Sequence, residues 1–411
     1  MNDPIEQFDV VVIGAGPAGA VSSSLLNQKG YRILVLEKQH FPRFSIGESL
    51  LPQCMTYLEQ ANMLEAVEAS AFQYKNGAAF SRGEEYEYFD FREKFSAGWG
   101  TTFQVQRDNF DKILADEAQK QGVQIRFGHT VIACDPLTDK RQLSVQSDKG
   151  KCYQVHAKFV LDASGFGRVL PKMLNLEQAS TLTPRQSIFT HIQDNIVLPE
   201  YDRDKILITV HPLHHEVWYW LIPFSNGRAS LGVVAPTELL EAMPGSPLDN
   251  LQELVSQGGQ LAHILKNAHY DTQVRTLGSY SCNVTSLYGE NYALLGNAGE
   301  FLDPIFSSGV TIAMTSASLA ATTVHRQLSG EQPDWESEYA EPLKTGVKTF
   351  KEFVEGWYDQ RFQNVVFSKT KSDDITRMIS SILAGYAWDT KNPYVKNPSR
   401  LSTLAQLCQG D

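Results

Sequence analysis

The chain is predicted to be an α/β protein that joins a Rossmann-type nucleotide-binding domain to an antiparallel-sheet domain and a helical C-terminal region. Three observations support this prediction. Residues 8–38 show a strand, a glycine-rich turn, a helix and a second strand in succession. Apolar residues alternate with period two between 186 and 234, which is typical of antiparallel strands. Residues 333–411 have a mostly helical pattern that is rich in aromatic side chains.

The domains are expected to be interleaved along the chain, because no low-complexity linker or internal repeat separates these patterns. The nucleotide-binding domain is assigned to residues 1–70, 100–170 and 285–330. The second sheet domain is assigned to residues 71–99 and 171–284, and the helical region to residues 331–411.

Composition disfavours several classes of protein. The chain has 411 residues with 36 Lys and Arg against 47 Asp and Glu, which gives a formal net charge of −11. A nucleic-acid-binding protein would normally carry a basic face, and no run of Lys or Arg occurs. The sequence has no long apolar run, no signal-peptide pattern and five scattered cysteines without a CxxC motif. We therefore expect a cytoplasmic protein with reduced thiols, no integral membrane segment and no nucleic-acid partner.

The first unit carries a nucleotide-binding fingerprint. The apolar residues 8–13 predict a buried parallel strand, and Gly14, Gly16 and Gly19 follow it at the spacing GxGxxG. These glycines permit a tight turn, let the backbone approach a pyrophosphate and let the next helix pack on the strand. Glu37 ends the following strand, where a carboxylate accepts hydrogen bonds from ribose hydroxyls. FAD or NAD is therefore favoured over NADP, because the acid disfavours a 2′-phosphate.

The segments that follow alternate between helices and strands. Helices are predicted over 51–70, 108–121, 236–266 and 310–328, with a break in the third at Pro244–Pro247. Short strands are predicted between 72 and 107, between 123 and 165, and over 291–295.

A second glycine-rich segment follows the strand at 291–295. It reads Gly296-Asn-Ala-Gly-Glu-Phe-Leu-Asp303-Pro304 and resembles the distal flavin motif GDAxxxxDP of the FAD-dependent monooxygenase superfamily, with Asn297 in place of the usual Asp. Asparagine still donates and accepts hydrogen bonds, so we expect the change to be tolerated. The resemblance implies a fold like that of p-hydroxybenzoate hydroxylase. Two such segments favour FAD over NAD, because NAD dehydrogenases need only the first.

Further motifs resemble the flavin-dependent halogenase branch of this superfamily, and the resemblance covers about residues 8–330. The stretch from Arg43 to Ser49 matches RxxxGES, and Trp218 to Pro223 matches WxWxIP with Val217 where the family carries a leading glycine. Two tryptophans at i and i+2 on a strand share one face, which by itself is equally typical of core packing. In the family this segment lines the flavin side of the site and discourages hydroxylation.

The resemblance implies roles for individual residues. Ser308 and Gly309, at a helix N-terminus, would hold a halide near the flavin, and capping of that helix by Ser307 or Ser308 is an alternative. Arg107 lies in the superfamily's R-x-x-F/L-D element, and an ion pair with Asp111 is an equal alternative to a ligand contact. The substrate pocket would include Trp218, Trp220 and Pro223. The residues expected to contact FAD are Gly14, Gly16, Ala18, Gly19, Glu37, Lys38, Arg43, Ile46, Glu48, Ser49, Arg107, Val131, Gly296, Asp303, Gly309 and Val310.

Lys75 is the predicted catalytic residue. In the halogenases a lysine that is followed two residues later by glycine lies next to the substrate, and Gly77 stands at that distance here. Such a lysine can hydrogen-bond a hypohalous acid as an ammonium group or trap it as a haloamine. Burial would favour the neutral amine by lowering the pKa from its usual value of about 10.4. Aromatic neighbours and an apolar strand argue against an ordinary surface lysine.

The function implied by the resemblance is that of a two-component FADH2-dependent halogenase. Reduced flavin and O2 would give a C4a-hydroperoxide, and chloride or bromide would attack it to give hypohalous acid. The substrate would be an electron-rich aromatic, a phenol or a pyrrole, either free or tethered to a carrier protein. Free tryptophan is disfavoured because the chain is shorter than the tryptophan enzymes. In addition, Ile305, Phe306 and Ser307 stand where those enzymes carry a glutamate.

The source of electrons is expected to be a separate NAD(P)H flavin reductase. Hydroxylases that bind NADPH themselves show DGxxSxxR where this chain has DASG at 162–165, and no second GxGxxG occurs. Two alternatives stay open: an FAD-dependent hydroxylase or geranylgeranyl-reductase-like oxidoreductase, which the Val217 departure supports, and a flavin-binding protein without turnover. His191, His211, His214 and His215 lack ligand spacing, so no metal site is expected.

Overall fold

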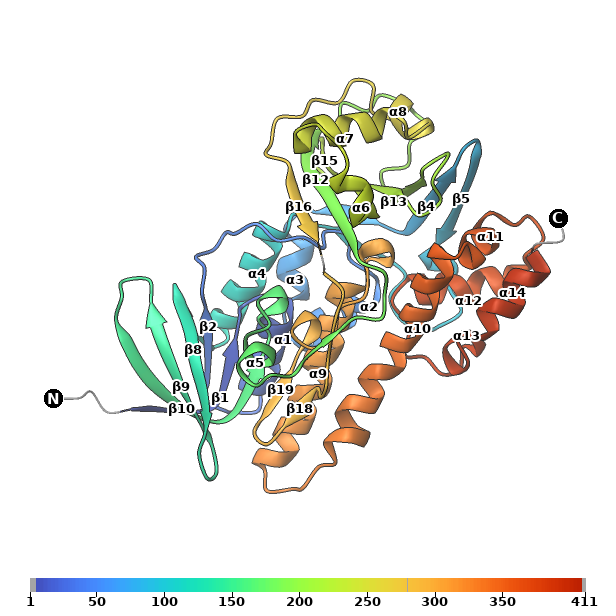
Figure 1. The fold of residues 1–411 in the computed structure, drawn as a ribbon. Helices are drawn as coiled ribbons and strands as arrows, with labels where there is room; N and C mark the ends of the chain where they lie inside the picture. The colour runs from blue at the N-terminus through green and yellow to red at the C-terminus, as the bar shows by residue number, and fades with distance from the viewer. Residues whose placement is uncertain (1–4, 279, 409–411) are drawn as a thin grey trace.

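The computed structural model describes residues 5–278 and 280–408, and two sheets organise it (Figure 1). The strands of the first sheet within the described chain follow the order β18-β19-β10-β1-β2-β7, and β9 and β8 extend it from β10. The pairs from β19 through β10, β1 and β2 to β7 are parallel. Parallel pairing suits these apolar runs, which are buried on both faces. The strands are β1 (Glu6–Ile13), β2 (Ile33–Glu37), β7 (Gln124–Phe127), β8 (His129–Pro136), β9 (Arg141–Ser147), β10 (Cys152–Asp162), β18 (Tyr288–Gly289) and β19 (Tyr292–Leu294).

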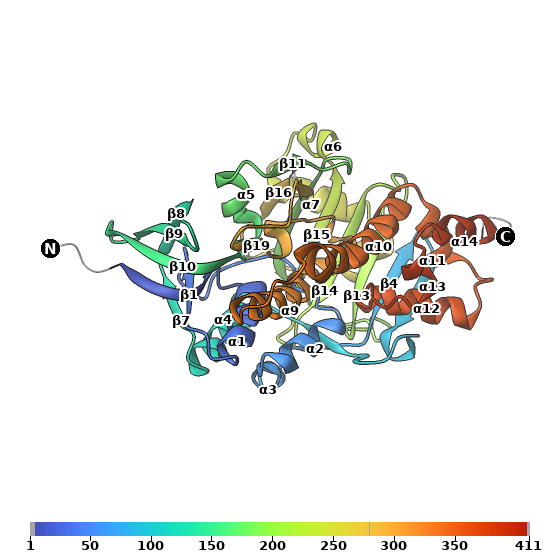
Figure 2. The ribbon, with the colours of Figure 1, turned by 90° about the horizontal axis from the view of Figure 1, so that it is seen from below.

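Three helices cover this sheet. Helix α1 (Pro17–Asn27) packs against α9 (Ser308–Leu328) and α4 (Arg107–Lys120). Helices α1 and α9 are rich in Ala, Ser and Gly, which lets their backbones approach closely, and Figure 2 shows them near each other beside the sheet. The predicted FAD-binding fold is therefore present.

The second sheet is built from segments that the first sheet interrupts. Its order is β16-β12-β15-β14-β13-β4-β5. All neighbouring pairs are antiparallel except β13 and β4, which are parallel. The antiparallel pattern predicted between 186 and 234 is confirmed for β12, β13, β14 and β15. The parallel pair arises because the β4–β5 hairpin comes from an earlier stretch of chain and adds to the sheet at β13. The strands are β4 (Gly77–Arg82), β5 (Glu85–Asp90), β12 (Arg185–Gln193), β13 (Lys205–Val210), β14 (Trp218–Pro223), β15 (Arg228–Pro236) and β16 (Arg275–Gly278).

Shorter elements connect the two sheets. The single helix expected over 51–70 is two helices, α2 (Gln53–Gln60) and α3 (Leu64–Glu68), because Asn62 between them has a φ of 55°. The break expected near Pro244–Pro247 is present, since Ser246 forms a capping box at the start of α7 (Pro247–Ser256). The remaining short elements are β3 (Gln73–Lys75), β6 (Thr102–Gln104), α5 (Val169–Met173), β11 (Glu177–Ala179), α6 (Thr237–Glu241), α8 (Gln260–Ile264) and β17 (Cys282–Val284).

The C-terminal region is helical, as predicted. Helix α10 (Glu341–Tyr358) follows a π-helical turn at Glu336–Ala340 and runs from the side of α9 toward the second sheet (Figure 2). Phe306 of the glycine-rich segment packs edge-on against Phe353 and Trp357 of α10. The other helices are α11 (Arg361–Phe367), α12 (Asp373–Leu383), α13 (Pro393–Lys396) and α14 (Arg400–Cys408). No helix of the described chain is long and apolar enough to cross a membrane.

Two hydrophobic clusters lie on opposite faces of the second sheet. Along β13, Ile206 and Ile208 belong to the large cluster shared with the first sheet, whereas Leu207 belongs to a smaller one beneath α7 and α8. Strand β14 alternates in the same way, with Trp218 inward and Val217 outward. This period-two alternation decides which side chains can reach the site. The domain bounds assigned from the sequence stay a prediction.

Candidate flavin-binding and catalytic site

A cavity lies where the carboxyl ends of β1, β2 and β10 meet the inner face of the second sheet. Ligands of open α/β sheets bind at such strand ends. The predicted site residues that line it are Gly14, Gly16, Ala18, Glu37, Lys38, Arg43, Ile46, Glu48, Ser49, Arg107, Val131, Trp218, Trp220, Gly309 and Val310. The predicted residues outside this lining are Gly19, Lys75, Pro223, Gly296, Asp303 and Ser308. Most of the predicted set therefore converges on one cavity, and its roles stay predictions.

The glycine-rich turn between β1 and α1 depends on close backbone contacts. Gly14 has a φ of 99°, and a Cβ there would lie 2.6 Å from the carbonyl oxygen of Ala163. A Cβ on Gly19 would lie 1.9 Å from the carbonyl oxygen of Gly14. Gly19 thus packs helix against strand behind the cavity wall. Helix α1 begins after Gly16 with no side-chain cap, so its first N–H groups are available to an anion.

Glu37 is fixed at the end of β2. Its two carboxylate oxygens accept hydrogen bonds from the backbone N–H groups of Ala15 and Gln39, each at 2.9 Å. The side chain is buried and lines the cavity beside Lys38. A carboxylate oxygen has capacity for a second hydrogen bond. Glu37 can therefore hold the turn and still accept from a ribose hydroxyl.

Two arginines share one buried carboxylate at the cavity wall. Arg107 donates to both oxygens of Asp111 at 2.7 and 3.0 Å, and Arg43 donates to the same group at 3.1 Å. Arg107 also donates to the carbonyl oxygen of Ile46 at 2.5 Å. The ion pair between Arg107 and Asp111, the alternative to a ligand contact, is present. Its bonds to Arg43 and Ile46 hold the 43–49 segment in place. Both arginines nevertheless line the cavity, so the two interpretations are compatible.

Glu48 and Ser49 present polar atoms that the protein leaves unsatisfied. Glu48 Oε1 lies 2.6 Å from Nε2 of His191. Burial opposes protonation of His191, but the hydrogen bond and charge of Glu48 outweigh it and raise the pKa of the imidazole. Glu48 Oε2 and Ser49 Oγ are buried and have no hydrogen-bond partner among the described residues. Buried polar atoms of this kind need a partner, which a flavin could supply.

The opposite wall comes from β14. Trp218 and Trp220 line the cavity and donate their indole N–H groups to Tyr358 Oη at 2.9 Å and Ser230 Oγ at 3.1 Å. Val217, which replaces the motif glycine, is buried on the other face of the strand. Its side chain therefore does not alter the cavity. Pro223 ends the strand outside the cavity lining.

The loop before α9 forms a third side of the cavity. Asn297, Ser307 and Gly309 line it. Ser307 has a φ of 54°, and its side chain makes no capping hydrogen bond to helix α9. Capping by Ser307, the alternative to halide binding, is therefore absent for this residue. Ser308 is buried as the first residue of a 21-residue helix. An uncapped helix N-terminus facing a cavity is a favourable position for an anion.

Asp303 lies behind this wall. Its carboxylate accepts from the backbone N–H of Ile305 at 3.0 Å and from the hydroxyl of Tyr358 at 2.9 Å. Burial raises the pKa of Asp303 to about 6. Since Tyr358 also accepts from Trp218, the chain Asp303–Tyr358–Trp218 connects the glycine-rich loop to the tryptophan wall. The contact of Asp303 with a cofactor stays a prediction. In the structure, the Asp303 carboxylate holds the hydroxyl of Tyr358 in place.

Lys75 is fully buried at the end of β3. Its ammonium nitrogen donates to the carbonyl oxygen of Leu50 at 2.7 Å and lies 5.4 Å from the ring centre of Phe91. Within the described residues it takes part in no ion pair. Burial lowers the pKa of Lys75 to about 7. The amine is thus adjacent to the segment that carries Glu48 and Ser49, although it does not itself line the cavity.

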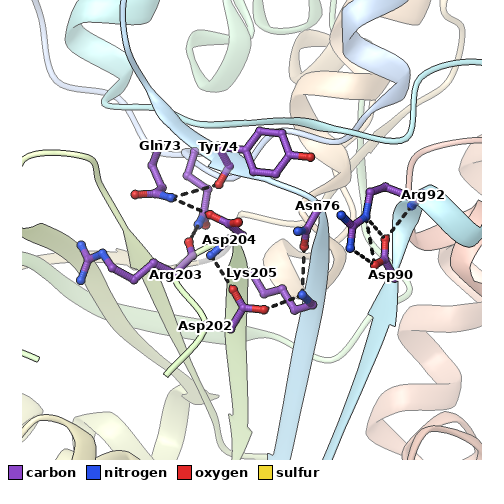
Figure 3. Close-up of polar contacts among 10 residues, drawn as sticks. Gln73, Tyr74, Asn76, Asp90, Arg92, Asp202, Arg203, Asp204 and Lys205 are labelled. Atoms are coloured by element: carbon purple, nitrogen blue, oxygen red, sulfur yellow. Dashed lines mark hydrogen bonds and ion pairs between the residues drawn. The ribbon is translucent and has the colours of Figure 1, made fainter. Parts of the chain in front are cut away.

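Polar contacts fix the backbone on either side of Lys75 (Figure 3). Asn76 donates its N–H to the carbonyl of Asp204 at 2.9 Å, and its side-chain oxygen accepts from Lys205 at 2.9 Å. Lys205 also pairs with Asp202 at 2.6 Å. Gln73 donates to Asp204 at 3.1 Å. The short strand that carries Lys75 is therefore held by the start of β13 rather than by its own sheet alone.

Sequence reasoning missed several groups at the site. Tyr358 comes from the C-terminal helix, and Tyr280, Phe44, Phe166 and Phe301 line the cavity from loops. Their positions carry no motif, and only the aromatic content of those segments could have pointed to them. No group of three or more possible metal ligands occurs in the described chain.

Residues 7–338 match the FAD binding domain family, so the chain belongs to that family. Several of the relatives that the chain resembles are flavin-dependent halogenases. A tryptophan 2-halogenase from Chondromyces crocatus is 32% identical over 331 residues, which are 78% of this chain and 62% of that relative. The match therefore spans less than two thirds of that protein. A chlorinase of 1H-pyrrole-2-carbonyl on a peptidyl-carrier protein, from Pseudomonas fluorescens, is 27% identical over 96% of this chain and 92% of its own.

Solved structures give the same fold. A flavoprotein/dehydrogenase from Cytophaga hutchinsonii is 43% identical, with a TM-score of 0.95 over 98% of this chain and 99% of its own. A flavin-dependent brominase, 24% identical, superposes with a TM-score of 0.84 over 96% and 98% of the two chains, and this likeness shows the fold alone. FAD fits the cavity described above: the open helix N-terminus, the Gly14 turn, Glu37 and the unsatisfied atoms of Glu48 and Ser49 supply partners for its polar groups.

Proposed function

We propose that the protein is a two-component, FADH2-dependent halogenase of an electron-rich aromatic, a phenol or a pyrrole. One observation carries the proposal: Lys75 is buried without a counter-ion among the described residues, with its pKa lowered to about 7, next to the segment that lines the flavin cavity. A lysine in this state is a nucleophile near neutral pH. The bound flavin, with O2, would supply the oxidant that converts chloride or bromide into hypohalous acid.

The residues of the chain have separate tasks in this proposal. The N-terminus of α9 at Ser308 and Gly309 would hold the halide. Lys75 would either hydrogen-bond the hypohalous acid or attack its halogen, in which case an N–X bond forms, the O–X bond breaks and water leaves. The aromatic carbon would then take the halogen from nitrogen and return a proton to the amine. Trp218 and Trp220 would exclude water from this path with their indole faces.

Two features support the phenol or pyrrole class. One relative is named for pyrrole-2-carbonyl on a carrier protein and is covered over 92% of its length. Phe306, which stands in the stretch where tryptophan enzymes carry a glutamate, packs against Phe353 and Phe362 in an apolar cluster. No carboxylate is therefore offered at that position. Tethering to a carrier protein is included in the proposal as one form of the substrate.

A separate NAD(P)H flavin reductase is the proposed electron donor. The two charged side chains of the stretch from Asp162 to Arg168 are engaged within the fold. Asp162 accepts from the N–H groups of Ser164 at 2.9 Å and Leu170 at 2.6 Å. Arg168 donates to Asn283 and Glu177. These contacts support a structural task for the two charges and, with it, an external electron donor.

A second candidate is an FAD-dependent oxidoreductase that does not halogenate. Its support is that Lys75 does not line the flavin cavity, together with the 43% identity to a flavoprotein/dehydrogenase. The decisive experiment incubates the protein with FAD, a flavin reductase, NADH, O2 and bromide against a panel of phenols and pyrroles, free and carrier-tethered. Products that gain the mass and isotope pattern of bromine support the halogenase. Products that gain only oxygen or hydrogen, at rates independent of bromide, support the second candidate.

A further inference from the structure

A second cavity, of about 540 Å³, lies on the outer face of the seven-stranded sheet. Sites for small molecules are usually of roughly 300–1,000 Å³. The strands and helix that form it, β4, β13 and α8, lie together in the upper part of Figure 1. Its walls are Ala79, Ser81, Tyr86, Leu198, Glu200, Tyr201, Asp202, Leu207, Gln260, His263 and Ile264.

The sheet itself separates this outer cavity from the flavin cavity. Ile206 lines the flavin cavity, and Leu207, the next residue of β13, lines the outer cavity. Successive side chains of a strand point to opposite faces. The two cavities therefore share one strand as a common wall without sharing a lining residue.

Two buried hydroxyls in the outer cavity have no partner. Ser81 is 2% exposed, and neither its Oγ nor the Oη of Tyr201 has a hydrogen-bond partner among the described residues. Both side chains line the cavity. Burial raises the pKa of Tyr201, which keeps the phenol neutral and able to donate. Buried polar groups in folded proteins are usually satisfied, so this pair is available to a ligand.

The rest of the lining sets the chemistry of that ligand. Ala79, Leu207 and Ile264 offer an apolar surface, and the exposed Tyr86 offers a ring at the edge. Glu200 forms no ion pair within the described chain, whereas Asp202 pairs with Lys205. No Lys or Arg lies among the lining residues of the described chain, and His263 is the one lining side chain there that could become cationic.

We propose that the outer cavity is a binding site for a small amphiphile: an apolar ring or chain that carries a hydroxyl group, an amine group or both, and that is neutral or positively charged. The polar group would exchange hydrogen bonds with Ser81 and Tyr201, and the apolar part would cover Ala79 and Leu207. The acidic edge disfavours carboxylates and phosphates of the same size. The proposal concerns a separate site and does not rest on the halogenase function.

The test uses tyramine and 4-hydroxyphenylacetate, which match in size and differ in charge. Binding is measured by titration calorimetry on the full chain with saturating FAD, so that the first cavity is occupied. Tyramine is expected to bind at one site, at least several-fold more tightly than the carboxylate. Equal binding of the two probes, or binding of neither, overturns the proposal.

Two matched Tyr→Phe variants locate the binding. Tyr201→Phe removes the unpartnered hydroxyl, so the melting temperature of the free protein is expected to stay or rise while tyramine binds roughly three- to tenfold more weakly. Tyr219→Phe is the control: its hydroxyl donates to the carbonyl of Leu254 at 2.7 Å on the same face of the sheet, outside the cavity lining. It is expected to lower the melting temperature and leave tyramine binding unchanged. The proposal is contradicted if Tyr201→Phe binds tyramine as tightly as the wild type does, or if this substitution lowers the melting temperature.

Discussion

The two long walls of the flavin cavity are built in different ways. The wall from Gly14 to Glu37 is mostly local: close backbone contacts shape it, and apart from Ala163 the groups that meet there lie within one strand–helix–strand unit. The wall of Trp218, and Lys75 outside the cavity lining, are positioned by distant segments, because Tyr358 holds the first and Leu50 the second. The wall that would hold the cofactor is therefore sensitive to any added side-chain atom. The groups expected to act on the substrate depend on single hydrogen bonds, each of which one substitution can remove.

Substitution of Gly19 is expected to have the largest effect on the local wall. A Cβ there would lie 1.9 Å from the carbonyl oxygen of Gly14, a backbone atom that cannot move aside as the end of a flexible side chain could. Gly19→Ala should lower the free energy of unfolding by about 3 kcal/mol and abolish FAD binding, measured by calorimetry and flavin absorbance. Gly278→Ala is the control, since its nearest neighbours lie 3.5 Å away at ordinary contact distance. Normal FAD binding by Gly19→Ala would show that the turn tolerates a side chain.

Removing the Lys75 amine, which lies outside the cavity lining, is expected to stop the chemistry while cofactor binding at the local wall stays intact. Lys75→Ala should keep FAD binding and oxygen consumption and reduce halogenated product by about 100-fold or more. Lys75→Arg should fail as well, because a guanidinium stays protonated and cannot form the same haloamine. The exposed Lys29 supplies the control variant Lys29→Ala. Near-normal halogenation by Lys75→Ala would remove this residue from the mechanism.

The burial of Lys75 also predicts a pH dependence of stability. Its pKa is about 7 in the folded protein and 10.5 for the free side chain, so between these values the unfolded chain binds more protons. Stability therefore rises as pH increases from about 7 to 10.5, and it is lost as pH falls through that window. Relative to Lys75→Met, the wild type should gain up to about 5 kcal/mol across the window. Parallel curves of unfolding free energy against pH for the two proteins would contradict a buried, uncharged amine.

A smaller effect is expected at Tyr358. Tyr358→Phe leaves Trp218 Nε1 and the carboxylate of Asp303 without this partner, which should cost about 2 kcal/mol of unfolding free energy. Product formation should fall several-fold through a raised KM, because Trp218 is no longer fixed. Tyr339→Phe, which loses a hydrogen bond to Leu294, should cost similar stability with KM unchanged. Equal kinetics in the two variants would show that bracing Trp218 does not matter.

The smallest effect on chemistry is expected at Val217. Its side chain packs on the outer face of β14, opposite Trp218. Val217→Gly, which restores the family glycine, should therefore change the ratio of halogenated to hydroxylated product by less than about twofold, although it loses buried apolar area and some stability. A large shift in that ratio, read by mass spectrometry, would show that this position controls the reaction through the backbone.

The sequence could predict what local rules determine. The spacing of Gly14, Gly16 and Gly19 required the turn, and the period-two pattern placed Trp218 and Trp220 on one face. It could not place Tyr358, because the partner of an indole N–H is chosen by tertiary packing. It also could not show that Asp303 braces the wall, or that β4 pairs with β13 in parallel. Those facts depend on how segments far apart in the chain meet.

The parallel pairing of β4 with β13 affects how the chain assembles. During synthesis β4 emerges long before β13, and until β13 arrives the apolar side chains of Ala79 and Phe80 have no strand beside them on that edge. Pairings between distant segments are slow to form and leave strand edges open to other chains meanwhile. Slowing translation would lengthen this exposure, so yield of the intact protein is expected to depend on chaperones that shield nascent strands.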